Sequence, residues 1–282
     1  MIDPSSSSSG HDYQAPPLPP KLAAEAGNEL PLYQYDQAVA LVSLHSHDTV
    51  RVCGLSSDTD VSSLHAAIAA SWPRGIDRVK EYTDAESPTP GVRMVKYKLN
   101  GMPWVAQGPD AVLARRLVAA IFRTLLALGW RLALTSDTSK REHDKDAWIL
   151  LRASPYAVAD PRHVFAISFN RYDRLRVIDA PDDVPVLVRS VLDRVWSKGV
   201  AQVLDYQGAL EYKLNGKPWY PLGTQEAMAS RWMIAQLLAH LKNYGYTVYA
   251  SIDMRYNTNN DDESDIDTWI AVKDLPPTYG AY

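Results

Sequence analysis

A set of charged residues occurs twice along this chain, in the same order, and could bind an anion in each of two places. Arginine and lysine bind carboxylates and phosphates through charge-assisted hydrogen bonds. We therefore consider two equivalent pockets for an anionic ligand. The alternative is that each arginine pairs with an aspartate of its own copy. The candidate ligand-binding residues are Arg51, Lys98, Arg115 and Asp137 in the first copy, and Arg176, Lys213, Arg231 and Asp253 in the second.

Other residues with chemical potential favour simpler interpretations. His45 and His47 could ligate a metal from one strand face, but Asn170 and Tyr172 replace them in the second copy. The oxygen-rich run 257–265 lacks the glycine and the spacing of an EF-hand loop, and a solvated hairpin loop fits it better. Cys53 has no evident activating neighbour and is expected to be a small buried residue. We expect no metal and no cofactor.

Motifs of several enzyme classes are missing from the sequence. It contains no Gly-x-Ser-x-Gly, no phosphate-binding loop, no His-Glu-x-x-His and no dinucleotide fingerprint. Catalysis by dispersed residues stays open, but no pattern names a reaction. We therefore favour a protein that is not an enzyme.

Both ends of the chain carry proline motifs that resemble ligands of protein-interaction modules. Ala15–Lys21 fits a polyproline II ligand of an SH3 domain, in which a cation pairs with an acidic pocket. Pro-Pro-Thr-Tyr near the C-terminus has the form that WW domains bind. The candidate docking residues are Pro16, Leu18, Pro19, Lys21, Pro276, Pro277 and Tyr279.

An internal duplication organises the rest of the chain. Tyr-Lys-Leu-Asn-Gly-Met-Pro-Trp at 97–104 recurs at 212–219 with one change, Lys217 for Met102. Tryptophans, glycines and charged residues before and after this block recur as well, and the spacing changes mainly where loops are expected. The repeated aromatic residues are interpreted as core anchors, and the Asn-Gly pairs as turns. The sequence therefore predicts two copies of one folded unit.

Each copy is predicted to be an α+β unit with the order ββαβαββ. Apolar residues around most of the helix at 110–128 suggest that it is buried, so we expect the copies to pack as a pseudo-two-fold pair. The expected strands lie at 39–45, 49–53, 131–135 and 147–152, with counterparts at 164–169, 175–178, 247–252 and 268–272.

Four segments follow from this organisation, together with expectations about location. They are a disordered Ser/Pro-rich tail at 1–36, repeat units at 37–154 and 162–275, and a short tail at 276–282. The formal charge of −4 and pI of about 6.0 give no support for a nucleic-acid partner. The longest apolar stretch is interrupted by Arg123, so we expect no membrane span. A single cysteine and no recognisable secretory signal favour the cytoplasm.

The favoured function is a non-enzymatic binding or adaptor protein. In this hypothesis the duplicated body binds a partner, while the proline motifs recruit WW or SH3 modules. One alternative is an anionic-ligand binder or enzyme that uses the repeated arginine, lysine and aspartate residues. Another is a self-assembling structural protein, because duplicated units with exposed strand edges can form homo-oligomers.

Overall fold

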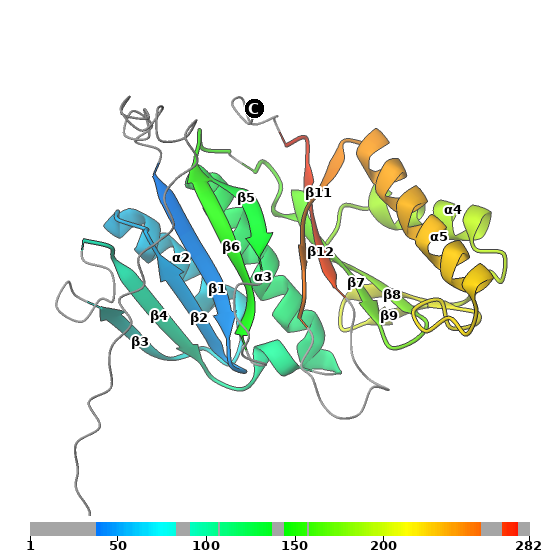
Figure 1. Ribbon diagram of the computed structural model, residues 1–282, viewed down its shortest axis with the longest axis horizontal. Helices are drawn as coiled ribbons and strands as arrows, with labels where there is room; N and C mark the ends of the chain where they lie inside the picture. The colour runs from blue at the N-terminus through cyan, green and yellow to red at the C-terminus, as the bar shows by residue number, and fades with distance from the viewer. Residues whose placement is uncertain are drawn as a thin grey trace, which may run out of the picture. The chain divides into compact units, whose positions relative to one another are not determined.

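Each copy of the repeated sequence folds into one antiparallel sheet with two helices on one face (Figure 1). This computed structural model describes residues 38–82, 91–106, 108–136, 144–156, 158–254 and 267–275. The chain divides into two units, and the second, Ala38–Tyr282, contains both copies. The tails that the sequence predicts at 1–36 and 276–282 lie outside the described residues.

Copy one forms a six-stranded sheet, called sheet 1, in the order β3-β4-β2-β1-β6-β5. Helices α2, Asp58–Ser71, and α3, Pro109–Ala127, cover it, and a short 3-10 helix η2 at Pro103–Val105 precedes α3. Its strands are β1 Val39–His45, β2 Thr49–Cys53, β3 Ile76–Tyr82, β4 Met94–Leu99, β5 Trp130–Ser136 and β6 Asp144–Arg152.

Copy two forms a second six-stranded sheet, sheet 2, with the equivalent strand order β11-β12-β7-β8-β10-β9. Its helices are α4, Asp183–Val195, and α5, Thr224–Asn243, and a short 3-10 helix η3 at Pro161–His163 leads into it. Its strands are β7 Val164–Asn170, β8 Arg174–Ile178, β9 Val200–Tyr206, β10 Ala209–Leu214, β11 Tyr246–Ile252 and β12 Thr268–Lys273. The α+β class and the tandem duplication are confirmed.

The predicted order ββαβαββ omits one strand in each copy, because the structure has ββαββαββ. The omitted strands are β3 and β9, which form one edge of each sheet. The central residues of β3 are all exposed, and β9 is mostly exposed. Both faces of such an edge strand are exposed to solvent, so its residues need not alternate between apolar and polar. The alternation that indicates a strand in a sequence is therefore absent.

The repeated eight-residue block makes the same hydrogen bonds in both copies. The hydroxyls of Tyr97 and Tyr212 donate to backbone carbonyls of the first helix, Val61 and Pro185 respectively. The Trp104 indole donates to the carbonyl of Thr49 at 3.0 Å, and the Trp219 indole donates to that of Arg174 at 2.9 Å. The block thus ties β4 to α2 and η2 to β2, and its repetition is explained by structure.

The contacts between the two copies are not reciprocal. Helix α3 of copy one packs against β7 and β8 of sheet 2. The equivalent helix of copy two, α5, packs on α4 and β11, and its outward side is exposed. The predicted pseudo-two-fold packing is therefore wrong. Its basis was the apolar circumference of α3, which α5 does not share, because α5 carries Gln236, His240 and Lys242.

Helix α3 lies in a core that both copies build. Buried residues of sheet 1, α2 and α3 form one cluster with strand residues of sheet 2 such as Ala166 and Ile270. Phe122 stacks on Trp148 of copy one with centroids 4.5 Å apart, and it meets the ring of Tyr249 of copy two edge-on at 5.7 Å. Copy one and copy two therefore share part of one hydrophobic core.

Removing the Phe122 ring should destabilise the whole unit. Phe122 is 0% exposed, so Phe122→Ala leaves a cavity between the copies, and we expect a loss of about 3–5 kcal/mol in the free energy of unfolding. Leu222→Ala is the control, because Leu222 is 84% exposed and its loss should cost less than about 0.5 kcal/mol. Urea unfolding followed by circular dichroism measures both values. Equal effects of the two substitutions would contradict the shared core.

Stability should also fall at alkaline pH. Burial raises the pKa of Tyr97 and of Tyr212 to about 12, from an ordinary value near 10. The unfolded chain therefore ionises first, and stability present below about pH 10 is lost as the pH rises toward 12. At pH 11 the loss is roughly 1 kcal/mol for each tyrosine. The double variant Tyr97→Phe/Tyr212→Phe should lose less stability than the wild type between about pH 9 and pH 11 in urea unfolding. An unchanged pH slope would refute this origin.

Candidate functional site

The candidate site is the face of sheet 1 that its own helices do not cover, here called the open face. Residues alternate between the two faces of a strand. Val50, Val52 and Tyr97 are buried on the helix side, whereas Arg51 and Lys98 on the other side are exposed. Each sheet therefore has one face that its own two helices cover and one face that they do not.

Five cations gather on the open face of sheet 1, at neighbouring positions of β2, β4 and β3. Arg51 stands opposite Lys96, and Lys96 stands opposite Lys80. One pleat away, Lys98 stands opposite Arg78. Like charges directly opposite each other destabilise a sheet unless something compensates them. We call this group the cationic face: Arg51, Arg78, Lys80, Lys96 and Lys98.

Few carboxylates compensate this charge. Asp48 accepts a hydrogen bond from Lys98 at 2.7 Å, and the Lys80 ammonium lies over the ring of Tyr82. Within the described ranges, no carboxylate pairs with Arg51, Arg78 or Lys96. Among the described residues, the cationic face therefore carries more positive than negative charge.

An apolar row runs beside the cations across all six strands of sheet 1. Its members are directly paired neighbours and are half-buried or exposed. The apolar row consists, in order, of Leu134, Ile149, Leu41, Cys53, Met94 and Tyr82. The open face therefore offers an apolar strip and a cationic strip side by side.

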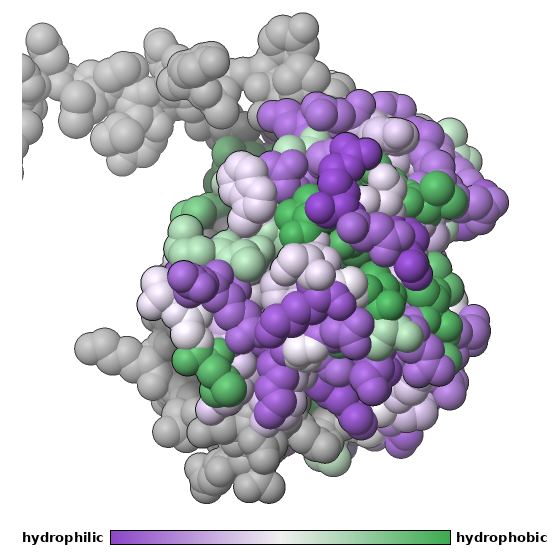
Figure 2. Space-filling model, turned by 90° about the vertical axis from the view of Figure 1, so that its right-hand side faces the viewer, coloured by the Kyte–Doolittle hydropathy of each residue, from purple (hydrophilic) through white to green (hydrophobic). Residues whose placement is uncertain are grey.

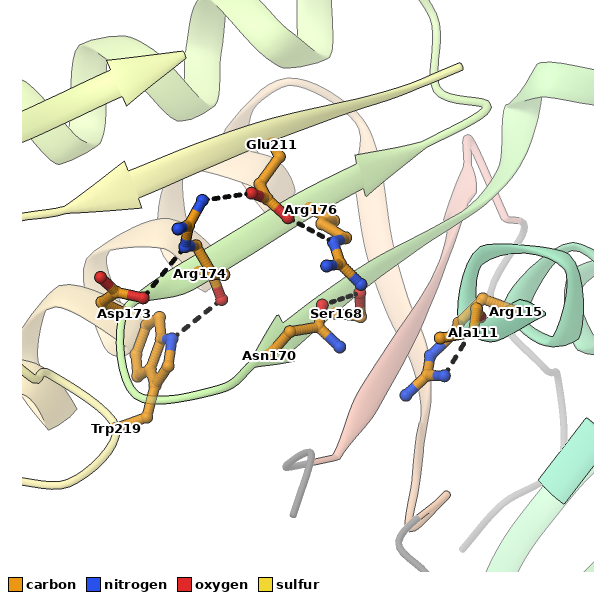
Figure 3. Close-up of polar contacts among 9 residues, drawn as sticks. All are labelled: Ala111, Arg115, Ser168, Asn170, Asp173, Arg174, Arg176, Glu211 and Trp219. Atoms are coloured by element: carbon orange, nitrogen blue, oxygen red, sulfur yellow. Dashed lines mark hydrogen bonds and ion pairs between the residues drawn. The ribbon is translucent and has the colours of Figure 1, made fainter. Parts of the chain in front are cut away.

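Sheet 2 carries the same face in a neutralised form, shown in Figure 3. Glu211 occupies the place of Lys96, stands opposite Arg176, and accepts hydrogen bonds from Arg174 at 2.5 Å and from Arg176 at 2.6 Å. Arg176 is 6% exposed and Glu211 is 3% exposed. The Arg176 guanidinium also lies 4.1 Å from the ring centroid of Tyr206. A buried cation needs such partners.

Helix α3 packs against the β7 and β8 strands on this side of sheet 2. From α3, Arg115 donates to the carbonyl of Ala111 at 3.1 Å (Figure 3). It also donates to the hydroxyl of Thr268 at 3.3 Å. Arg116 donates to both oxygens of Asp179, at 3.0 and 2.9 Å. The apolar row of sheet 2 is buried beneath the helix, including Ala250, Ile270, Ala166 and Ile178.

The structure does not place the predicted ligand-binding residues equivalently. Arg51 is exposed and Arg176 is buried, whereas Arg115 is buried and Arg231 is exposed. Lys98 is exposed and pairs with Asp48. The remaining positions have these environments: Lys213 and Asp253 are half-buried, and Asp137 lies outside the described residues.

The docking motifs of the tails stay predictions. All of their residues lie outside the part of the chain that the structure describes: Pro16, Leu18, Pro19, Lys21, Pro276, Pro277 and Tyr279.

Three members of the cationic face escaped the sequence argument, although a signal was present. Arg78 and Lys80 are two residues apart, as are Lys96 and Lys98. A cation at every second position of a strand places the charges on one face. Arg78, Lys80 and Lys96 do not recur in copy two, where Gln202, Leu204 and Glu211 stand at the corresponding places.

A hollow of about 360 Å³ lies beside α3, between α2 and the strands β7 and β8. Its lining includes Arg116 and Arg123. Arg116 is engaged by Asp179, and Arg123 donates to the carbonyl of Pro161 at 3.1 Å. Because both cations already have partners, this hollow is a weaker anion site than the cationic face.

The described residues offer little for metal or nucleophilic chemistry. Among them, no group of three or more His, Cys, Asp or Glu side chains could hold a metal ion. Burial raises the pKa of the Cys53 thiol, which disfavours the reactive thiolate. His45 hydrogen-bonds Ser43 at 2.7 Å. Of the helices described, none has the length and apolar character needed to cross a membrane.

Comparison with known proteins agrees with the duplication. One protein-family model matches the chain twice, over residues 38–151 and 163–272, which is most of its length. The chain belongs to this family. It contains two copies of the family's domain, and each match spans one sheet with its helices. No curated protein and no solved structure matches the chain.

Exchanging the charges of the two faces should cost much more stability in copy two than in copy one. Glu211→Lys leaves Arg174 and Arg176 with no buried carboxylate, so we expect a loss of about 3–5 kcal/mol in the free energy of unfolding. The matched change Lys96→Glu places a carboxylate between Arg51 and Lys80, and we expect stability within about 0.5 kcal/mol of the wild type. Urea titration measures both. Equal losses would show that burial under α3 does not distinguish the faces.

Proposed function

We propose that this protein is a non-enzymatic binding protein whose open face on sheet 1 binds an acidic, amphipathic helix of a partner protein. The observation that carries the proposal is the helix α3, which already lies on the equivalent face of sheet 2. The packing of α3 on sheet 2 therefore shows that this kind of sheet face can bind a helix.

The apolar row supports a helical partner. In sheet 2 the equivalent row is buried under α3 by residues spaced along one side of that helix. In sheet 1 the row is half-buried, with Leu134 56% exposed at its edge. An amphipathic helix with apolar residues three and four apart would cover this row in the same way.

The cationic face supports a partner that brings carboxylates. In sheet 2 a carboxylate of the sheet itself, Glu211, neutralises the arginines. Sheet 1 has Lys96 at this place, so burial of Arg51 and Lys96 requires acidic groups from the partner. A partner of low charge would leave these cations buried and unpaired, which would be unfavourable.

A helix is favoured over a nucleic acid. A nucleic-acid strand presents a regular line of phosphates, and it would meet the apolar row with little apolar surface of its own. The row contains Tyr82 at its end but otherwise aliphatic or sulfur-containing side chains, which do not stack bases well. The overall charge of −4 also argues against a nucleic acid.

The remaining parts of the proposal rest on the sequence. The proline motifs near both ends would recruit SH3 or WW modules, so that the protein acts as an adaptor. A peptide array of 14–21 and 274–282 against such modules tests this part separately. A cytoplasmic location is proposed because the chain has one cysteine and therefore no intramolecular disulfide.

A helical peptide made from α3 itself provides the probe. In this peptide, residues 109–127 carry Arg115→Glu, Arg116→Glu and Arg123→Glu, so that the apolar stripe remains while the charge is reversed. We expect a fluorescently labelled form to bind the protein in a polarisation titration, and added salt to weaken binding. The double variant Arg51→Glu/Lys96→Glu should bind at least about tenfold more weakly, or about 1.4 kcal/mol.

Matched controls separate the cationic face from general charge attraction. The peptide with the original α3 sequence has three arginines and should not bind. The protein variant Arg189→Glu/Arg194→Glu changes two exposed cations on α4 and should bind the acidic peptide like the wild type. Equal binding by the Arg51→Glu/Lys96→Glu variant would overturn the proposal. Tighter binding of a labelled oligothymidine than of the acidic peptide would replace the helix with a nucleic acid.

A further inference from the structure

The hollow beside α3 has an apolar floor and is open to solvent. Its volume is about 360 Å³, which lies within the range of pockets that bind small molecules. Val164, Ile178 and Ala120 line the hollow and are buried, so they form its floor. Ala70 and Pro73 also line it and are exposed, so they lie at its mouth. The hollow is therefore a pocket that a small molecule can enter.

Small side chains of copy one create this space. Ala67 and Ser71 lie one turn apart on α2 and line the hollow. The repeated tryptophan after each helix aligns α2 with α4, and this alignment places Val191 and Val195 at the corresponding positions. Both valines pack in the core of copy two. The two smaller residues of copy one therefore leave room that valines at the same positions would occupy.

Arg123 gives the hollow a positive charge in excess. Its Nη1 group donates to the carbonyl of Pro161 at 3.1 Å, and no carboxylate among the described residues pairs with it. Arg116, by contrast, is neutralised by Asp179. The Nε and Nη2 groups of Arg123 donate to no residue that the structure describes. This edge of a guanidinium can bind a carboxylate through two parallel hydrogen bonds.

We propose that the hollow binds a small amphipathic acid, a molecule with an aliphatic body and a single carboxylate. The body lies on the apolar floor, where burial of its surface provides most of the affinity. The carboxylate lies at Arg123, which fixes the orientation of the ligand. A bare anion gains nothing from the floor, so the cationic face remains the stronger site for it.

The lining narrows the class of ligand further. Its described residues include Leu113, Val164 and Ile178 but no aromatic ring, so an aliphatic body fits it better than a planar one. Only one cation is in excess, which disfavours polyphosphates. Helices α2 and α3 of copy one and strands β7 and β8 of copy two all contribute to the lining. A ligand in the hollow therefore contacts both copies.

Isothermal titration calorimetry of the full-length protein with sodium octanoate tests the proposal. We expect saturable binding at one site per chain. Ala67→Val/Ser71→Val introduces the residues of copy two and should weaken binding at least about tenfold, because the valines fill the hollow. Ala66→Val/Ala69→Val is the matched control, since these alanines are exposed on α2 outside the lining and should leave the affinity unchanged. Circular dichroism verifies that each variant is folded.

The neutral analogue 1-octanol tests the role of the charge. Arg123→Gln removes the charge and should weaken octanoate binding at least about tenfold, while the affinity for 1-octanol stays the same. An equal loss for both compounds, or no loss for octanoate, would refute the carboxylate site. Arg51→Glu/Lys96→Glu should bind octanoate like the wild type. The proposal and the binding function of the cationic face can therefore fail separately.

Exposed apolar side chains on α5 are a competing place for octanoate. Met228 and Trp232 are 57% and 61% exposed. Figure 2, which looks onto the side of α4 and α5 in Figure 1, shows green residues there among the purple hydrophilic ones. Trp232→Ala should leave the affinity for octanoate unchanged. A loss as large as that of Ala67→Val/Ser71→Val would locate the ligand on α5 and refute the proposal.

Protection of a thiol locates the ligand directly. In a Cys53→Ser background, Ala70→Cys places a thiol at the mouth of the hollow. Octanoate at about ten times its Kd should slow alkylation of this thiol by iodoacetamide about tenfold. Ala69→Cys, outside the lining, should react at the same rate with and without octanoate. A wild-type protein that binds no octanoate would overturn the proposal, and so would equal alkylation rates of Ala70→Cys with and without it.

Discussion

The structure depends on one interaction: a buried carboxylate of sheet 2 neutralises two neighbouring arginines. Glu211 provides it, accepting from both Arg174 and Arg176. Helix α3 packs against β7 and β8 of the same sheet and joins the two copies into one unit. With Lys96 at the same place, sheet 1 cannot be covered by an uncharged helix at low cost. One position of the repeat thus distinguishes a buried face from an open one.

Duplication preserved the framework and allowed its surfaces to diverge. The hydrogen bonds made by Tyr97 and Trp104 recur in Tyr212 and Trp219, because they connect elements inside each copy. Residues that face the other copy are under a different constraint, since each copy has a different neighbour. Arg116 pairs with Asp179 across the copies, whereas Trp232 at the corresponding place of α5 is exposed. Equivalent backbone positions therefore do not imply equivalent roles.

This divergence explains what sequence reasoning could and could not predict. The repeated block at 97–104 and 212–219 was sufficient to predict the duplication, because local hydrogen bonding and core packing impose the same residues. Strands β3 and β9 were missed because they are exposed edges without alternation. The environment of Arg115 could not be predicted, because its partner Thr268 belongs to the other copy. Periodicity reports which side of a helix is apolar, but not which sheet lies against it.

The two copies also limit how the chain can assemble. A domain with a packing surface on its helix and another on its open sheet face could, in principle, stack without end, as solenoid repeats do. Here the first open face is cationic and the last helix is apolar with two cations, so the ends do not complement each other. Terminal units of repeat proteins are commonly modified to stop stacking. The charges at Arg51 and Lys96 act in this sense, because they oppose the packing of another cation-bearing helix on the open face of sheet 1.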